Sequence, residues 1–441
     1  MRCNKLFALL GAAAVAASAS DSIPAARPGK PLLLRGATVH TVTGAVLPAT
    51  DVLLRDGKIA ALGPKLAAPG DAAIVEVSGK HVYPGLISAV SGMGLTEHNS
   101  VRGSVDLAET GALNPNARTQ PALNPDSDHI PVSRANGILT ALSVPMSTGL
   151  IAGTSTLIRM DGWTWEDLTL RAAVALHVYW PSMAVNRDPG AARSAADQER
   201  TITDNLRRLR DAFAAARAYV VAKDSAAART DFDSRWEAMR PVLRGARPVF
   251  VHATERKQIE AAVAWARAEK LKITLVGGID AWKVADLLKA HDIPVIVSPV
   301  LTLPLRREDP YDASYANPGH LHAAGVRFCI ANDGSAEMGT MADRNLPYQA
   351  AKAAAHGLPP AEALKAVTIY PAQLLGVAAE LGSIEVGKRA TLIVTDGDPL
   401  EVATQVEQAY IDGARIDLTS RHTRLRDKYQ QRQEQLKAGG R

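Results

Sequence analysis

The sequence predicts an α/β protein whose middle forms a (β/α)8 barrel of the TIM type. Three observations support this prediction. Between residues 81 and 379, short apolar runs alternate with helical stretches, which is typical of parallel βα units. This region is about 300 residues long, somewhat more than the roughly 250 of a typical barrel of this kind. Strand-and-turn patterns lie outside the region at both ends of the chain and predict a smaller β-rich unit.

Residues 1–20 have the pattern of a secretory signal. Arg2 and Lys5 precede an apolar run over residues 6–17, and a small-residue cleavage site lies near Ala19. The apolar run is too short to cross a bilayer as a helix. We therefore expect an exported protein, periplasmic in a bacterium, with no transmembrane segment.

Residues 32–80 and 380–417 predict strands and tight turns. Residues 32–39 form an apolar run, and residues 51–63 place an Asp-Gly turn between apolar flanks, which is a strong hairpin signal. A second Asp-Gly turn at residues 412–413 lies in the later segment.

The central region supplies the strands and helices of the barrel. The first strand is expected within residues 81–92, and the others at residues 137–142, 157–158, 173–178, 249–252, 273–276, 295–297 and 326–330. The expected helices are residues 255–269, 281–290, 344–355 and 361–367. Residues 191–239 are rich in Ala, Arg and Asp, and we expect them to form an inserted pair of helices at the barrel rim.

Composition excludes several classes of protein. The formal net charge of +5 is located in residues 418–441, which carry seven Lys and Arg against two acidic residues. The rest of the chain is balanced, so no basic groove for nucleic acid is expected. We expect the tail to be a solvated basic helix, and a subunit contact or a contact with an anionic surface is the alternative. After signal cleavage Cys329 is the only cysteine, which excludes an internal disulfide and a Cys-rich zinc site.

Residues 84–87, Pro-Gly-Leu-Ile, resemble the first barrel strand of the amidohydrolase superfamily. In that family the strand continues as Asp-x-His-x-His, and the two His bind a catalytic metal. Here Ser88 stands in place of the Asp, and Val90 and Gly92 stand in place of the two His. The resemblance therefore extends to the scaffold but not to this pair of metal ligands.

Residues 382–394 resemble the closing motif of the same superfamily at nearly every position, with Thr391 in place of the usual Asp. Together the two motifs make the chain similar to the imidazolonepropionase-like branch, with a degenerate metal centre. The resemblance implies that residues 32–80 and 380–417 form one composite β-sandwich. The barrel, residues 81–379, is inserted between them.

The resemblance also implies where ligands would lie. The superfamily places a pair of His after strand 1, a carboxylated Lys or a Glu after strand 4, single His after strands 5 and 6, and an Asp after strand 8. His252 matches the strand 5 ligand, and Asp333 matches the strand 8 residue that takes a proton from the attacking water. Gly277 stands at the strand 6 position, and strand 4 has no obvious match. The alternatives are a hydrogen-bonded His252 without a metal and an Asp333 that only forms a turn.

A catalytic zinc site usually has three protein ligands, and the matched positions supply two. His98, Glu97 and Asp280 are the candidates for the third. The alternative for Asp280 is that it caps the helix that follows it. His320 and His322 are two residues apart in an expected helix and would not face one metal.

Two functions follow as expectations. The first is an exported hydrolase of non-peptide C–N bonds, in a cyclic amide or a small peptide-like substrate, with one divalent metal such as zinc or with none. The second is a non-catalytic barrel that binds a small molecule or a protein partner. A homo-oligomer is compatible with both.

Overall fold

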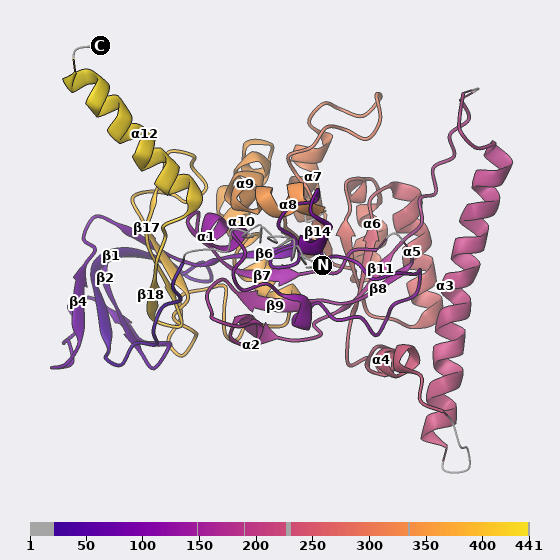
Figure 1. Ribbon diagram of the computed structural model, residues 1–441, viewed down its shortest axis with the longest axis horizontal. Coiled ribbons are helices and arrows are strands. Elements are labelled where there is room, and N and C mark those ends of the chain that lie inside the picture. Colours follow the sequence, from indigo (N-terminus) through magenta and orange to yellow (C-terminus); the bar gives the residue numbers. More distant parts are fainter. Residues whose placement is uncertain (1–21, 148, 189, 226–230, 334–335, 440–441) are drawn as a thin grey trace, which may run out of the picture.

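The computed structural model describes residues 22–439 apart from positions 148, 189, 226–230 and 334–335. The expected signal segment lies outside the described residues. The β-rich unit lies at one end of the molecule, the strands and helices of the central region lie in the middle, and the long helix α3 (Ala195–Asp224) stands at the opposite end (Figure 1).

Both ends of the chain contribute to one eight-stranded sheet. Its strand order is β18-β17-β16-β5-β1-β2-β3, with β4 paired to β1. The bounds are β1 (Leu32–His40), β2 (Val46–Arg55), β3 (Lys58–Gly63), β4 (Ala73–Glu76), β5 (His81–Pro84), β16 (Leu392–Thr395), β17 (Val406–Ile411) and β18 (Ala414–Ile416). Strands β5 and β16 pair antiparallel and join the early half of the sheet to the late half. The composite character expected from the sequence is visible here, whereas a two-layer sandwich stays a prediction.

The two Asp-Gly turns have the backbone that tight hairpins require. Asp56 and Gly57 have φ of 52° and 75°, and Asp412 and Gly413 have φ of 50° and 76°. Positive φ at both central residues defines the type I′ turn, whose twist matches that of the flanking strands. The turn chemistry of the sequence therefore sets these hairpins.

The central region contains two further sheets. One has the order β10-β9-β7-β6 and the other β15-β14-β13-β12-β11-β8. The bounds are β6 (Leu86–Ser91), β7 (Ile138–Ser143), β8 (Ile151–Thr154), β9 (Thr156–Arg159), β10 (Thr169–Arg171), β11 (Leu176–Tyr179), β12 (Val249–Ala253), β13 (Ile273–Gly277), β14 (Val295–Val297) and β15 (Phe328–Ile330). Strands β11 to β15 are parallel, as are β6 and β7. This is a mixed α/β fold with the parallel pairing that a TIM-type barrel needs, although the ladders of the described residues form two sheets rather than one closed ring.

One strand boundary differs from the expectation. The strand expected over residues 173–178 begins only at Leu176. Ala173 has a φ of 49°, a left-handed conformation that interrupts the extended backbone before the strand begins. The apolar run continues through this bend, so the sequence pattern does not reveal it.

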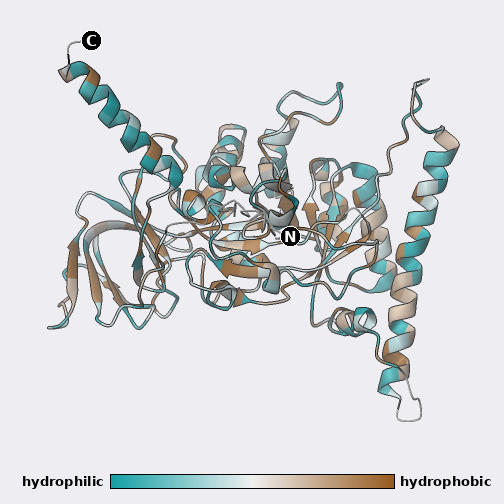
Figure 2. Ribbon diagram, viewed as in Figure 1, coloured by the Kyte–Doolittle hydropathy of each residue, from teal (hydrophilic) through white to brown (hydrophobic). Residues whose placement is uncertain are grey.

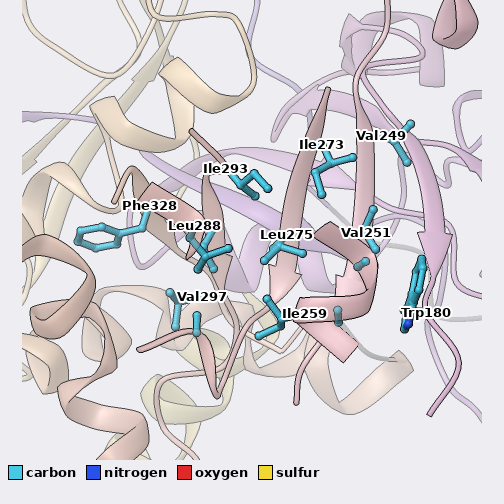
Figure 3. Packing of buried hydrophobic residues seen from close by; sticks show 14 of the residues in the cluster. Trp180, Val249, Val251, Ile259, Ile273, Leu275, Leu288, Ile293, Val297 and Phe328 are labelled. Atoms are coloured by element: carbon cyan, nitrogen blue, oxygen red, sulfur yellow. The ribbon is translucent and has the colours of Figure 1, made fainter. Parts of the chain in front are cut away.

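Helices cover the parallel strands. They are α5 (Arg256–Glu269), η3 (Ala281–Val284), α6 (Ala285–Ala290), α7 (Ala313–Ala323), α8 (Ala336–Ala342), η4 (Asp343–Asn345), α9 (Leu346–Ala355), α10 (Pro360–Lys365) and α11 (Ile369–Leu374). Shorter helices precede them: η1 (Arg102–Ser104), η2 (Gln120–Ala122), α1 (His129–Arg134) and α2 (Trp165–Leu168). Figure 3 shows the packing between layers, where Ile259 of α5 lies against Val251 of β12 and Leu275 of β13.

The expected inserted pair of helices is α3 with α4 (Ser234–Leu243). Ser194 begins α3 by accepting a hydrogen bond from the backbone N–H of Asp197, 3.1 Å away. The far end of the chain forms α12 (Arg421–Ala438), which buries none of its side chains and is largely hydrophilic (Figure 2). In the described part of the chain, every helix is too short or too polar to cross a membrane.

Candidate functional site

A pocket of about 280 Å³ opens at the carboxyl ends of the parallel strands. Such ends carry the active sites of TIM-type barrels. The residues lining it include Tyr179, Trp180, His252, Gly277, Ser298 and Asp333. The two residues selected from the sequence, His252 and Asp333, therefore line the same pocket.

The His252 ring is held by two neighbours from β11. In the parallel register Tyr179 lies beside His252, and the two rings stack with centroids 3.9 Å apart. His177, two residues earlier on β11, places its Nδ1 2.9 Å from Nε2 of His252. The Tyr179 hydroxyl donates to the carbonyl oxygen of Pro145 at 3.0 Å. These contacts fix the orientation of the imidazole at the pocket wall.

Both imidazoles are neutral near pH 7. Burial lowers the pKa of His252 to about 3, and burial together with the neighbouring His252 lowers the pKa of His177 well below its usual value. Nε2 of His177 is buried and has no hydrogen-bond partner among the described residues. A buried N–H without an acceptor is costlier than an unused lone pair, so we assign the shared proton to Nδ1 of His177. Nε2 of His252 is then the acceptor, and its lone pair is already used.

Asp333 follows β15 and is exposed at the pocket rim. The preceding residue, Asn332, anchors this segment. The Ser298 hydroxyl donates to the Asn332 carbonyl oxygen at 2.6 Å, and the Gln349 side chain donates to the Asn332 amide oxygen at 2.6 Å. A carboxylate is thus presented to the pocket from a fixed strand end, while the turn expected at Gly334 lies outside the described residues.

Asp280 is not a free third ligand. It is buried, and one oxygen accepts hydrogen bonds from the backbone N–H of Arg256 at 3.0 Å and from the Arg306 guanidinium at 2.6 Å. The other oxygen lies 3.0 Å from Nζ of Lys283. Burial alone would raise its pKa, but these hydrogen bonds lower the pKa below the usual value. The expected capping of the following helix is also wrong, because the side chain binds the first N–H of α5 instead.

Glu97 and His98 lie away from the pocket. Glu97 accepts a hydrogen bond from the Asn124 amide at 3.3 Å, and Nδ1 of the exposed His98 accepts one from the backbone N–H of Ser100 at 3.3 Å. His320 and His322 lie on helix α7, as expected. Nowhere in the described ranges do three or more His, Cys, Asp or Glu side chains gather closely enough to hold a metal ion.

Glycines stand at two positions where the family resemblance would place His ligands. Gly277 has a φ of 101°, and a Cβ there would lie 2.9 Å from Oγ1 of Thr254. A Cβ on Gly92 would collide with Oγ1 of Thr340. Since Nε2 of His252 is also engaged, the described residues of this pocket do not fit a three-ligand catalytic zinc.

Sequence reasoning missed the two residues that surround His252. Strand β11 lies next to β12 and occupies the place of barrel strand 4, for which no ligand could be found in the sequence. His177 and Tyr179 alternate with apolar residues along β11, and this period of two is the signal that could have placed them on one face. It could not have shown that this face meets His252.

Comparison with known proteins identifies the family of the chain. The model of the amidohydrolase family matches residues 150–416. The amidohydrolase tasK of Hapsidospora irregularis is 25% identical over 87% of this chain and 43% of its own length. The N-substituted formamide deformylase of Arthrobacter pascens is 50% identical over 12% of this chain and 11% of its own. The chain thus spans less than half the length of the curated relatives it matches.

A solved structure resembles nearly the whole chain. The amidohydrolase from Thermotoga maritima has a TM-score of 0.76 and 26% identity, over 88% of this chain and 99% of that one. The imidazolonepropionase-like branch stays a prediction. Because the family match covers more than half of its length, this chain belongs to the amidohydrolase family.

Proposed function

We propose that this protein is a hydrolase that cleaves a C–N bond of a small cyclic or peptide-like amide in the pocket at the carboxyl ends of β12 to β15. Family membership supports a hydrolase. The single observation that supports the location is that Asp333 and His252, which the family resemblance selects at the ends of two different strands, line one pocket.

Asp333 is the general base of this proposal. Amide hydrolysis needs a water molecule to lose a proton as it attacks, and free water has a pKa of about 15.7. A positioned carboxylate that takes this proton contributes a factor of about 10² to 10⁴ in rate. The exposed Asp333 reaches a water molecule and substrate at the pocket rim.

His252 is a neutral positioning group in the same proposal. With Nε2 accepting from His177, the proton of His252 lies on Nδ1, so the ring can only donate a hydrogen bond to a substrate and does not act as an acid–base group near pH 7. Tyr179 and His177 already hold the ring in one orientation. Binding a substrate therefore costs little further conformational entropy of this side chain.

Substitution of the base tests the proposal. We expect Asp333→Asn to lower kcat/KM by about 10² to 10⁴, because the amide cannot accept the proton. The control is Asp71→Asn, an exposed carboxylate in the β-rich unit, which should leave kcat/KM unchanged. The measurement is product formation by mass spectrometry over a panel of cyclic amides and dipeptides. Equal turnover by Asp333→Asn and wild type would contradict the role of Asp333.

The single divalent metal expected from the sequence is a separate prediction. It would need a third ligand beyond the His252 and Asp333 side chains, or the loss of the His177 contact to Nε2 of His252. Metal content of protein purified without chelator measures this directly. One equivalent in wild type that is lost in His252→Ala would establish such a site, and no metal in either protein would refute it.

Binding without catalysis is the second candidate function. The observation that favours it is that Gly277 and Gly92 stand where the family resemblance would place His ligands, and Gly277 has a φ of 101°, a conformation that a His rarely adopts. Calorimetry on the same panel separates the two candidates. Tight binding of a panel member without turnover in wild type would support the non-catalytic barrel, and turnover that depends on Asp333 would exclude it.

A further inference from the structure

A second, larger cavity adjoins the candidate pocket. Its volume is about 590 Å³, and it lies between α3 and the central strands; we call it the α3 groove. Tyr179 and Trp180 line both the α3 groove and the candidate pocket. Tyr179 and Trp180 thus form part of the wall of both cavities, and Tyr179 stacks on His252.

The face of α3 changes character where it meets the groove. In its second half, the stripe toward the core is apolar and buried and includes Leu209, Phe213 and Ala216. Toward the start of α3, the residues that line the groove are mostly polar; they are Gln198, Thr201, Asn205 and Arg208, with Ile202 as the one apolar residue among them. An amphipathic helix normally keeps such a stripe apolar along its length. Here the polar half faces a cavity instead of the core.

The groove is positively charged. Arg193 and Arg208 line it, and none of its described lining residues is Asp or Glu. Neither arginine forms an ion pair within the described part of the chain. Two other arginines of α3 are paired, Arg207 with Asp204 and Arg217 with Glu269, each at 2.9 Å. The charges of Arg193 and Arg208 at the groove are not neutralised by an acidic side chain among the described residues.

We propose that the α3 groove is a subsite that binds the distal carboxylate of an elongated, peptide-like amide substrate. The guanidinium groups of Arg193 and Arg208 receive the carboxylate, since arginine presents a fork of donors that matches two carboxylate oxygens. The chain of the substrate passes Tyr179 and Trp180 and places its amide beside Asp333. This inference rests on the proposed function, which supplies the amide substrate. It adds that the substrate carries a carboxylate group.

Binding of a matched pair of probes tests the subsite. The first is N-acetyl-alanyl-glutamate α-amide, and the second is N-acetyl-alanyl-glutamine α-amide, which differs only in the side-chain carboxylate. Calorimetry at low salt should show the acidic probe binding wild type about tenfold more tightly, a magnitude expected for hydrogen bonds to a charged group. Added salt should reduce this preference because both arginines are exposed.

Variants assign the preference to the groove. We expect Arg208→Gln and Arg193→Gln each to remove most of the preference for the acidic probe. The control is Arg210→Gln, which removes the same charge from an exposed position of α3 that does not line the groove, and it should keep the preference. Failure of wild type to prefer the acidic probe, or equal losses in all three variants, would overturn the proposal.

The readout is binding, so it does not depend on turnover. A protein that prefers the acidic probe through Arg193 and Arg208 but hydrolyses nothing would refute the proposed function and leave the subsite standing. Turnover that depends on Asp333, in a protein that does not prefer the acidic probe, would support the proposed function and refute the subsite.

Discussion

Asp343 shows how one residue can carry a large electrostatic cost. Its side chain is fully buried on η4, and the Ser88 hydroxyl donates to it at 3.0 Å. Burial raises its pKa to about 7, although the hydroxyls of Ser88 and Ser91 lower it in part. Ser88 occupies the position of the family's strand 1 Asp, so a carboxyl group reaches this place from a different part of the chain.

The stability of Asp343→Asn relative to wild type should therefore increase as pH rises. In wild type the folded pKa exceeds the unfolded value, so stability is present at low pH and is lost between about pH 4 and 7. Asparagine does not titrate. The free energy of unfolding of Asp343→Asn minus that of wild type should increase with pH, by at most about 1.4 kcal/mol per pH unit. Denaturant unfolding at pH 4.5, 6 and 8 measures the difference, and a difference that does not change with pH would contradict the raised pKa.

The His252–His177 pair has the opposite dependence. Its folded pKa values lie below the unfolded value of 6.5, so the pair stays neutral while the unfolded chain takes up protons. The free energy of unfolding of wild type thus decreases as pH falls from 6.5 toward 3, because protons bind these two imidazoles only in the unfolded chain. The stability deficit of His252→Gln should be largest near pH 7 and should shrink on acidification, as measured by the same unfolding experiments. A deficit independent of pH would show that the pair is not held neutral.

Helix α3 illustrates the element scale. Its composition predicts a helix, but its position depends on the apolar stripe that packs on the central region. The ring of Phe213 meets that of Trp265 edge-on, with centroids 5.0 Å apart. The same helix carries exposed apolar residues such as Val221, which is 72% exposed, so hydrophobicity alone does not identify the buried face.

Truncation of the buried ring should destabilise the protein far more than truncation of an exposed side chain. We expect Phe213→Ala to lower the free energy of unfolding by about 3 to 5 kcal/mol, from lost burial and the cavity left behind. Val221→Ala should stay within about 0.5 kcal/mol. Thermal and denaturant unfolding compare them, and similar costs for the two variants would contradict the packing of α3.

At the scale of the whole molecule, the two ends of the chain depend on each other. Strand β16 pairs with β5 across more than 300 residues of sequence and is fully buried, whereas α12 buries none of its side chains. The central region is therefore inserted in sequence between two halves of one sheet, which pair directly with each other through β5 and β16, and the last helix contributes no buried side chain.

Two truncations should separate these contributions. A chain ending at Ser420 lacks α12 and should keep the Tm and the cooperative unfolding of the full chain. A chain ending at residue 388 also lacks β16 to β18, exposes β5 and removes part of the core, so we expect no cooperative transition. Circular dichroism and size-exclusion chromatography measure both, and a folded shorter chain would show that the β-rich unit does not need its late strands.

The sequence by itself determined the α/β class, most strand and helix positions, the two Asp-Gly hairpins and the presence of His252 and Asp333 at strand ends. These features follow from local terms, namely the periodicity of apolar residues and the conformations that Asp-Gly allows. Only the tertiary structure decided that His177 binds His252, that Asp280 binds Arg306 and Lys283, and that a polar face of α3 lines a groove beside the pocket. These contacts join residues that are distant in sequence, and the order and register of the strands determine which of them meet.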